Sequence, residues 1–438
     1  MSAVGAHIGH RAVVSRRPFW LQPPTVAVLG AMLFNFVLCF VNTNAGGIGN
    51  GAVIGCEVAI IIAVLFYTYP TLTYPMFLAI GGALLYLIAL SAVRVMLGSS
   101  VDVKPVRDLL IPIVFFLLGV GAHDVRAADK IVRVAVLIVI AVGVFEYFFP
   151  AVFTRFFNVA SFYIERGAMG TAQAQQSSNL FVSGMRPEGA SGGRGLLPFL
   201  GNHRVSSIFL EPISAGNFGI VVFMWALVRS LMERRIFGGL MASGVLIIIM
   251  SDSRFGANFC VLCLLLAVLP SAIRTAGVAV LPAFALMGVV LLPGPLSAHY
   301  GVDNGFIGRI ILSGRILERF DVLNWLGLQT PNFPTADSGY AYALAGIGII
   351  GLIIFWAMLL LLKGSSSRFY LFRDMAGAYF AALLCISNSP FTIKTGALLW
   401  FLAGVLSRAE SFGLRPGGVR PTAHVTFDVP AGARPVRR

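Results

Sequence analysis

Long apolar runs, each of about 17–24 residues, recur along the whole sequence. A run of this length crosses a hydrocarbon core of about 30 Å as a helix, whereas a strand of a membrane barrel alternates over about ten residues. We see no such alternation, and 58% of the residues are hydrophobic while only 11% are charged. A soluble chain of 438 residues could not bury so much apolar surface. The sequence therefore predicts an all-α, polytopic membrane protein.

About twelve transmembrane helices are expected, with two large polar loops between them. The first loop, 151–207, follows the fifth helix, and the second, 294–338, follows the ninth. A tail at 1–24, helices within 25–150, 208–293 and 339–407, and a disordered tail at 408–438 complete the expected organisation. By run length, the expected spans are 25–43, 52–69, 76–97, 108–122, 131–150, 208–228, 236–251, 255–270, 273–293, 339–362, 373–388 and 391–407.

The positions of lysine and arginine set the expected orientation. The tail before the first helix carries Arg11, Arg16 and Arg17, so it should be cytoplasmic. Twelve crossings then place both large loops outside the cytoplasm. The net charge of +14 is spread over short loops and tails in this way, which argues against a nucleic-acid partner. The exception is the connection from Arg94 to Arg107, which puts three positive charges on the outer side.

Arg204 and Glu211 stand at the mouth of the sixth expected helix. They are seven residues apart, about two turns, so they would share a face if the helix began near Arg204. A carboxylate just inside an apolar span is costly, which favours a functional role over an ion pair within the helix. We interpret Arg204 as an anion-binding residue. We interpret Glu211 as a base whose pKa is raised by its half-buried position.

Other candidates border the same outer side. Arg254, in Ser-Asp-Ser-Arg, either faces an outer cavity or forms a tight turn in which it and Asp252 cap helix ends. Asp337 precedes a Gly-rich span, where it is either the N-cap or a base at the cavity mouth. These two positions therefore offer a cation and a carboxylate close to the expected membrane surface.

The second loop carries three arginines, Arg309, Arg315 and Arg319, on a stretch that fits a short helix lying on the membrane. A guanidinium group binds phosphate oxygens through two parallel hydrogen bonds and stays charged at any relevant pH. Two arginine-bearing loops could therefore clamp a diphosphate. The alternative is a solvated face that pairs with Glu318 and Asp321 or contacts anionic lipid headgroups.

Four short motifs carry a family resemblance, which is best between about 200 and 362. They resemble, in order and placement, those of Wzy-type polysaccharide polymerases and the related O-antigen ligases. Ligases place a histidine where Asp337 stands here, which favours a polymerase. The motifs are Arg204-x-Ser-x-Ile-Phe-x-Glu211-Pro-x-x-x-Gly216, Ser251-Asp-Ser-Arg254-Phe-Gly256, Ser313-Gly-Arg315 and Asp337-Ser-Gly-Tyr, which leads into a span containing Gly348 and Gly351.

The resemblance implies a bacterial inner-membrane enzyme, similar to lipid-dependent glycosyltransferases, that joins undecaprenyl-pyrophosphate-linked oligosaccharides into exopolysaccharide or O-antigen. It also implies that no metal or other cofactor is needed, because arginines stabilise the departing diphosphate. We expect Arg204, Arg254, Arg315 and Arg319 to bind pyrophosphate and either Glu211 or Asp337 to be the catalytic base. The expected partners are the lipid-linked oligosaccharide, membrane lipid and a chain-length regulator. A ligase and a flippase remain the alternatives.

Overall fold

The computed structural model describes residues 18–99, 103–170, 179–181, 184–185, 203–300, 306–335 and 337–408. Most of the expected N-terminal and C-terminal tails, and most of the Gly- and Ser-rich part of the first loop, lie outside these residues. Within them the chain forms helices and no strand, and one isolated antiparallel bridge joins Met185 to His203.

Each of the twelve expected spans contains a helix. Seven of these helices are long and apolar enough to cross a membrane, as in a multi-pass membrane protein: α1, α2, α3, α5, α9, α12 and α16. The count of twelve crossings stays a prediction. The twelve helices are α1 (Pro23–Ala45), α2 (Asn50–Thr68), α3 (Tyr74–Met96), α4 (Val103–Ala122), α5 (Val125–Phe148), α9 (Pro212–Glu233), α10 (Gly238–Met250), α11 (Arg254–Val268), α12 (Ser271–Leu291), α16 (Gly339–Leu361), α17 (Ser367–Leu384) and α18 (Ile393–Arg408).

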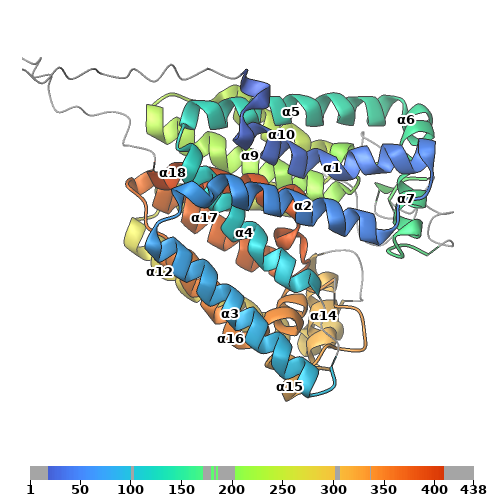
Figure 1. Cartoon of the computed structure of the whole chain (residues 1–438), viewed down its shortest axis with the longest axis vertical. Helices are drawn as coiled ribbons and strands as arrows, with labels where there is room; N and C mark the ends of the chain where they lie inside the picture. The colour runs from blue at the N-terminus through green and yellow to red at the C-terminus, as the bar shows by residue number, and fades with distance from the viewer. Residues whose placement is uncertain are drawn as a thin grey trace, which may run out of the picture.

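Shorter helical segments fill the connections. The two loops contain α6 (Pro150–Phe156) and α7 (Val159–Glu165), then α13 (Pro293–Ser297), α14 (Phe306–Leu317) and α15 (Val322–Trp325). Single 3-10 turns occur at η1 (Phe19–Leu21), η2 (Tyr69–Thr71), η5 (Ser207–Phe209) and η6 (Ser389–Phe391). In Figure 1, α6, α7, α14 and α15 all lie toward the right-hand end of the helices. This shared end is called the loop end below.

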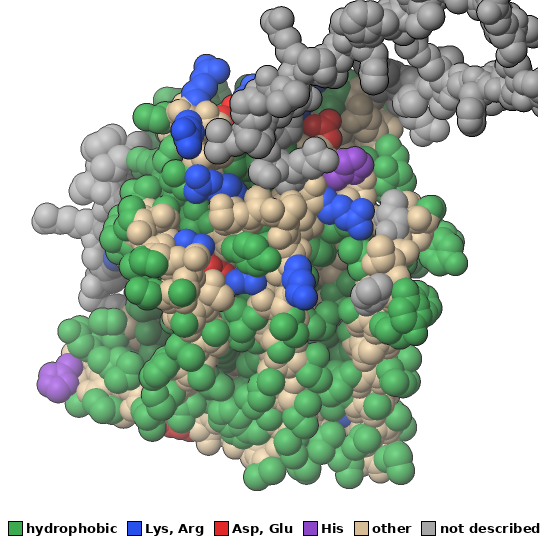
Figure 2. Space-filling model, turned by 90° about the vertical axis from the view of Figure 1, so that its left-hand side faces the viewer, with side chains coloured by type: hydrophobic (Ala, Val, Ile, Leu, Met, Phe, Trp, Pro, Cys, Tyr) green, Lys and Arg blue, Asp and Glu red, His purple; other side chains and the backbone are tan. Residues whose placement is uncertain are grey.

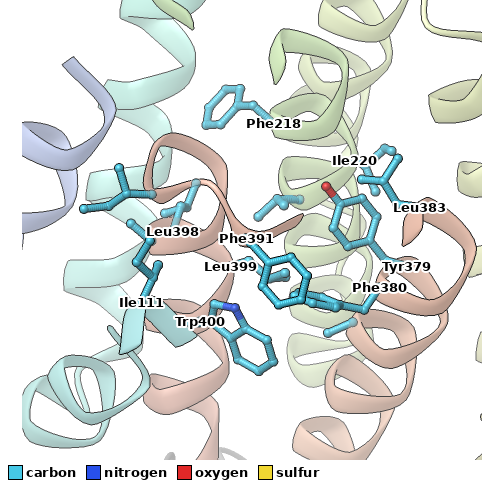
Figure 3. Close-up of a cluster of buried hydrophobic side chains, with 14 of the residues drawn as sticks. Ile111, Phe218, Ile220, Tyr379, Phe380, Leu383, Phe391, Leu398, Leu399 and Trp400 are labelled. Atoms are coloured by element: carbon cyan, nitrogen blue, oxygen red, sulfur yellow. The ribbon is translucent and has the colours of Figure 1, made fainter. Parts of the chain in front are cut away.

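The core is built around α9, α17 and α18. In the most apolar window of α9, 83% of the residues are buried, against 17% in α3 and in α12, so α9 is central and the other two are peripheral. Aromatic side chains from α17, η6 and α18 pack together, with the Phe380 ring 5.7 Å from Trp400 and 5.3 Å from Phe391. Figure 3 shows these rings pointing toward one another and toward side chains of α4 and α9. The loop end of this core positions the candidate site.

The first loop is anchored to the helices instead of forming one surface helix. The chain bends between α6 and α7, and Phe153 and Phe162 are fully buried. Phe157, at the bend, stacks on Phe36 of α1 with ring centroids 4.1 Å apart. Asn158 then caps α7 by accepting a hydrogen bond from the Ser161 N–H. The phenylalanines of the first loop therefore fix it against the helices, with Phe157 on α1.

A break in α16 joins the second loop to α3. Gly348 has φ +66° and ψ 173°, and its Cα lies against the backbone of Leu326 and Gly327 so closely that a Cβ would overlap it. The Arg94 guanidinium donates to the carbonyls of Gly327 and Ala345, both at 2.6 Å, and to that of Gly346 at 2.9 Å. Arg94 is 2% exposed. The unexpected positive charge at this position is therefore bonded to backbone within the protein.

Buried ion pairs lie toward the other end of the helices. Arg229 of α9 pairs with Asp129 of α5 at 2.8 Å. Asp374 of α17 accepts from Arg274 of α12 at 2.8 Å and from its own neighbour Arg373 at 2.8 Å. Figure 2 looks onto this end of the molecule, where lysine and arginine side chains gather over the upper half and hydrophobic ones dominate below.

Candidate functional site

The segment before α9 is held by a buried carboxylate. Glu146, fully buried near the end of α5, accepts hydrogen bonds from the backbone N–H groups of Ser206 and Ser207 and contacts the His203 ring at 3.3 Å. This anchor keeps 203–207 out of the helix, and Ser207 (φ 51°) and Leu210 (φ 62°) adopt left-handed conformations. Left-handed non-glycine residues cost energy and cluster at functional sites.

Because α9 begins only at Pro212, Arg204 and Glu211 do not share a helix face as the sequence spacing suggested. The alternative of an ion pair between them is also wrong. The Glu211 carboxylate instead pairs with Lys394 of α18, at 2.7 Å. It also accepts hydrogen bonds from the Tyr163 hydroxyl at 2.6 Å and the Ser214 hydroxyl at 2.9 Å.

These partners reverse the expected acidity of Glu211. Burial alone would raise its pKa, but the Lys394 ammonium and the hydrogen bonds from Tyr163 and Ser214 hold the pKa of the carboxyl below its usual range. Burial and the neighbouring Glu211 carboxylate raise the pKa of the Tyr163 phenol well above its usual range. Glu211 is therefore an ion-paired carboxylate, and the expectation of a raised pKa is wrong.

Arg166 covers the Tyr163 side of this arrangement. Its guanidinium lies 5.3 Å from the centre of the Tyr163 ring and 5.1 Å from that of Phe162. Its Nε is buried and has no hydrogen-bond partner among the residues that the structure describes. A buried donor without an acceptor costs free energy, so Arg166 is suited to receive an acceptor from a ligand.

A second acid–base set adjoins the first. Arg107 of α4 pairs with Glu57 of α2 and with its own neighbour Asp108, which accepts from the Tyr342 hydroxyl at 2.6 Å. The Glu57 carboxylate also interacts electrostatically with both Arg166 and Lys394. A small cavity beside this set is lined in part by Asp108, Tyr342 and Phe391. We call the six charged residues the charged cluster: Glu57, Arg107, Asp108, Arg166, Glu211 and Lys394.

Arg204 contacts the turn before α11, which leads into Arg254. The Arg204 Nε donates to the Ser251 carbonyl at 3.2 Å. Ser253 packs so tightly on Gly216 that a Cβ there would overlap it. Ser253 also caps α11, by accepting from the Gly256 N–H at 3.1 Å, so the cap expected of Asp252 belongs to Ser253. The first and second motifs are thus brought together in space.

The second-loop candidates lie on α14 and in the segment between α14 and α16. Arg309 pairs with Asp337 at 2.7 Å, and Asp337 is 66% exposed at its side chain. Arg315 is exposed, and Arg319, also exposed, lies 5.9 Å from the ring centre of Phe333. The N-cap of α16 is Ser338, so the capping role considered for Asp337 is wrong. The pairing considered between these arginines and Glu318 or Asp321 is replaced by the Arg309–Asp337 pair.

The convergence of these arginines on one diphosphate stays a prediction. Arg204 lies in the segment before α9 and Arg254 is the first residue of α11. Arg315 lies on α14, which packs on α12, α13 and α16, and Arg319 lies just after α14. Lys394, by contrast, was not among the expected site residues. Lone charges inside apolar runs mark functional sites, and that signal was present in the sequence at Glu57, Glu146 and Lys394.

The cluster suits anion binding and proton transfer better than metal binding. Among the described residues, no group of three or more His, Cys, Asp or Glu side chains is placed to hold a metal ion. Three cations and three carboxylates instead lie together at the loop end, with two tyrosine hydroxyls donating to carboxylates. No protein-family model, curated protein or solved structure matches the chain. The resemblance to polymerases therefore rests on the sequence motifs alone.

Proposed function

We propose that this protein is a metal-independent glycosyltransferase that polymerises oligosaccharide units carried on undecaprenyl pyrophosphate. In this proposal all twelve long helices cross the inner membrane of a bacterium, and both large loops face the periplasm. The substrate's lipid tail lies in the bilayer and its sugar in water, so the reaction must occur at a membrane surface. The product is exopolysaccharide or O-antigen, and membrane lipid and a chain-length regulator are the other proposed partners.

The observation that carries the proposal is the partly buried Tyr163–Glu211–Lys394 arrangement beside the Arg166 Nε, which has no hydrogen-bond partner among the described residues. A sugar diphosphate substrate needs a base for the acceptor hydroxyl and positive, hydrogen-bond-donating groups for its phosphates. The carboxylate of Glu211, the ammonium of Lys394 and the Arg166 Nε can supply these. Glu211 directly precedes α9, and Lys394 is the second residue of α18. In the proposed orientation the loop end is the periplasmic side, where a lipid-linked unit meets its acceptor.

The proposed reaction is a single displacement. An acceptor hydroxyl oxygen bonds to the anomeric carbon of the donor sugar, the bond from that carbon to the pyrophosphate oxygen breaks, and undecaprenyl pyrophosphate leaves. The hydroxyl proton passes to Glu211, which we favour over Asp337 because Asp337 is exposed and paired with Arg309. Inversion at the anomeric carbon is the expected outcome.

The cations act on the leaving group. Negative charge grows on the pyrophosphate as the bond breaks, and pre-positioned cations stabilise that charge in the transition state. Lys394, which is buried, and the buried Nε of Arg166 are the first candidates, and Arg204 and Arg254 are those that the motifs predict. Arg315 and Arg319 take this role only if the second loop approaches the first when substrate binds. Loss of one such donor costs about 10²–10³ in rate.

A second candidate function is a flippase for the same lipid-linked oligosaccharide. The specific observation in its favour is that Glu57, Arg107 and Asp108 lie inside apolar helices. Intramembrane charges of this kind mark the substrate paths of transporters. The anchored first loop and the strained segment before Glu211 are better explained by a fixed catalytic site.

Deletion of the gene, followed by analysis of lipid-linked glycans, tests the proposal. Single repeat units accumulating on the periplasmic side are expected for a polymerase. Units trapped on the cytoplasmic side would overturn it in favour of a flippase, and long unligated chains on the carrier lipid in favour of a ligase.

Complementation with variants sharpens the result. Arg166→Lys keeps the charge but removes the Nε donor, so polymer length or amount should fall. Arg155→Lys, on the exposed face of α6, is the matched control and should restore the wild-type polymer. Wild-type polymer from both variants would remove Arg166 from the diphosphate site.

A further inference from the structure

Lys394 is the link between the two halves of the charged cluster. It lies one residue into α18 and is 5% exposed. Its ammonium pairs with Glu211 at 2.7 Å and donates to the Phe209 carbonyl at 3.3 Å. An ammonium group has three N–H donors, and among the described residues two of them have acceptors, so one is left for a ligand. The Phe209 contact ties Lys394 to the same strained segment that carries Glu211.

Glu211 cannot be an effective base while this ion pair stands. Its carboxylate accepts from Lys394, Tyr163 and Ser214, and these contacts hold its pKa below the usual range, which disfavours protonation. Efficient general-base catalysis needs a proton affinity nearer to the working pH. Something must therefore weaken the Lys394–Glu211 pair before the acceptor hydroxyl is deprotonated.

The ligand itself can supply that change. A diphosphate diester carries two negative charges, so a diphosphate beside Arg166 would compete with the single carboxylate of Glu211 for the Lys394 ammonium. We propose that Lys394 exchanges its partner when the donor binds. Before binding, Lys394 pairs with Glu211. When the donor binds, Lys394 turns to the diphosphate, which releases Glu211 to accept the proton of the acceptor hydroxyl. This inference rests on the proposed function and adds an order to it, with donor binding before base activation.

The charged and titratable groups around Glu211 come from α7, α18 and, behind them, α2. The loop-end segment α7 contributes Tyr163 and, just after it, Arg166, and α18 contributes Lys394. Behind them, the Glu57 carboxylate of α2 acts on both Arg166 and Lys394. Bound donor adds negative charge to this set. The proton affinity of Glu211 should therefore rise on donor binding, because Lys394 turns away and two phosphate charges arrive.

Calorimetry of donor binding without acceptor measures this proton directly. The probe is a short-chain polyprenyl pyrophosphate glycoside, whose two phosphates are both ionised and do not titrate over the range used. Titrations of the full chain in detergent micelles, at about pH 5 in buffers of different ionisation enthalpy, give the protons taken up per donor bound. The wild type should take up a proton on binding, whereas Glu211→Gln and Lys394→Gln should take up almost none.

Steady-state kinetics give a second readout. The acid limb of kcat reports groups in the substrate complex, and that of kcat/KM reports the free enzyme. In the wild type the kcat limb should lie about one pH unit or more above the kcat/KM limb. In Lys394→Gln the two limbs should coincide, with a raised KM for donor. Lys363→Gln, exposed at the other end of the helices, is the matched control and should behave as the wild type.

The outcomes separate this inference from the function on which it rests. Donor binding and polymerisation without proton uptake, with coincident limbs in the wild type, would overturn the exchange role of Lys394 and leave the polymerase intact. No binding of the probe to the folded wild type would count against the proposed function. If Lys394→Gln fails to fold, Lys394→Arg keeps the ion pair and can replace it. Glu211→Gln still tests whether Glu211 is the group that takes up the proton. If Glu211→Gln took up as many protons per donor bound as the wild type, the proposal would be refuted.

Discussion

Replacing Arg94 by methionine should remove the hydrogen bonds that hold the second loop against the break in α16. Arg94 donates three hydrogen bonds, to the carbonyls of Gly327, Ala345 and Gly346. A hydrogen bond from a charged group contributes about 1.5–3 kcal/mol, and buried carbonyls left without a donor cost about 1–3 kcal/mol each. Such contributions are not additive within one network, so we expect a total loss of about 3–5 kcal/mol.

The assay is the free energy of unfolding in mild detergent, measured by titration with a denaturing detergent. Limited proteolysis of the second loop is the local readout, because 306–335 is held at Gly327 by this arginine. Arg94→Lys keeps the charge but not the fork that reaches three carbonyls, so it should lie between the wild type and Arg94→Met. Arg155→Met, on an exposed arginine of α6, should change stability by less than about 0.5 kcal/mol.

The reasoning would be refuted if Arg94→Met were as stable as Arg155→Met and its second loop no more accessible to protease. That result would mean that the three carbonyls find other donors at no cost, and that Arg94 does not hold the loop.

Three further predictions concern the backbone and the charges of the site. Gly348→Ala should destabilise the protein by about 2–4 kcal/mol, because a positive φ of +66° costs about 1–2 kcal/mol for a residue with a Cβ and that Cβ would overlap the second loop. The control is Gly81→Ala, in open space on α3, which should stabilise the protein by up to about 1 kcal/mol. Equal effects of the two substitutions would contradict the break in α16. Glu146→Gln should cost about 2–3 kcal/mol and speed amide exchange in the segment that it anchors, whereas unchanged exchange would show that another group holds this segment. The folded-state pKa of Glu211 lies below the ordinary value of 4.5, so its ion pair stabilises the fold above that pH, and this stabilisation is lost as pH falls through the lower folded value. Between about pH 5 and 3, the free energy of unfolding should therefore fall more steeply with pH in the wild type than in Glu211→Gln. Equal slopes in the two proteins would contradict the pairing.

The helices could be predicted from the sequence because the length of each apolar run, and the glycine, proline and polar residues that end it, are local features. All twelve expected segments are helical, and most boundaries lie within a few residues of the observed ones. The start of α9 differs, at 212 instead of 208, because a carboxylate on α5 binds the backbone of Ser206 and Ser207. A hydrogen bond between residues about 60 positions apart leaves no local trace in the sequence.

The site was predicted less completely, for the same reason. Short motifs identified Arg204, Glu211 and Arg254, and the structure brings the first and second motifs together at Gly216. The partner of Glu211 is Lys394, 183 positions further along the chain, and nothing in a single sequence relates the two. A charge isolated in an apolar run indicates that a partner exists, but only the packing of the helices identifies it.

The buried arginines at the end opposite the loops contribute to two steps, membrane insertion and the packing of the helices. In the proposed orientation Arg229, Arg274 and Arg373 are cytoplasmic charges during insertion, and acidic residues have little influence on that step. Once the helices assemble, Asp129 and Asp374 neutralise them in ion pairs. A substitution such as Asp374→Asn should therefore leave topogenesis unaltered and harm only assembly, so a correctly threaded but unpacked chain would be delivered to membrane quality control.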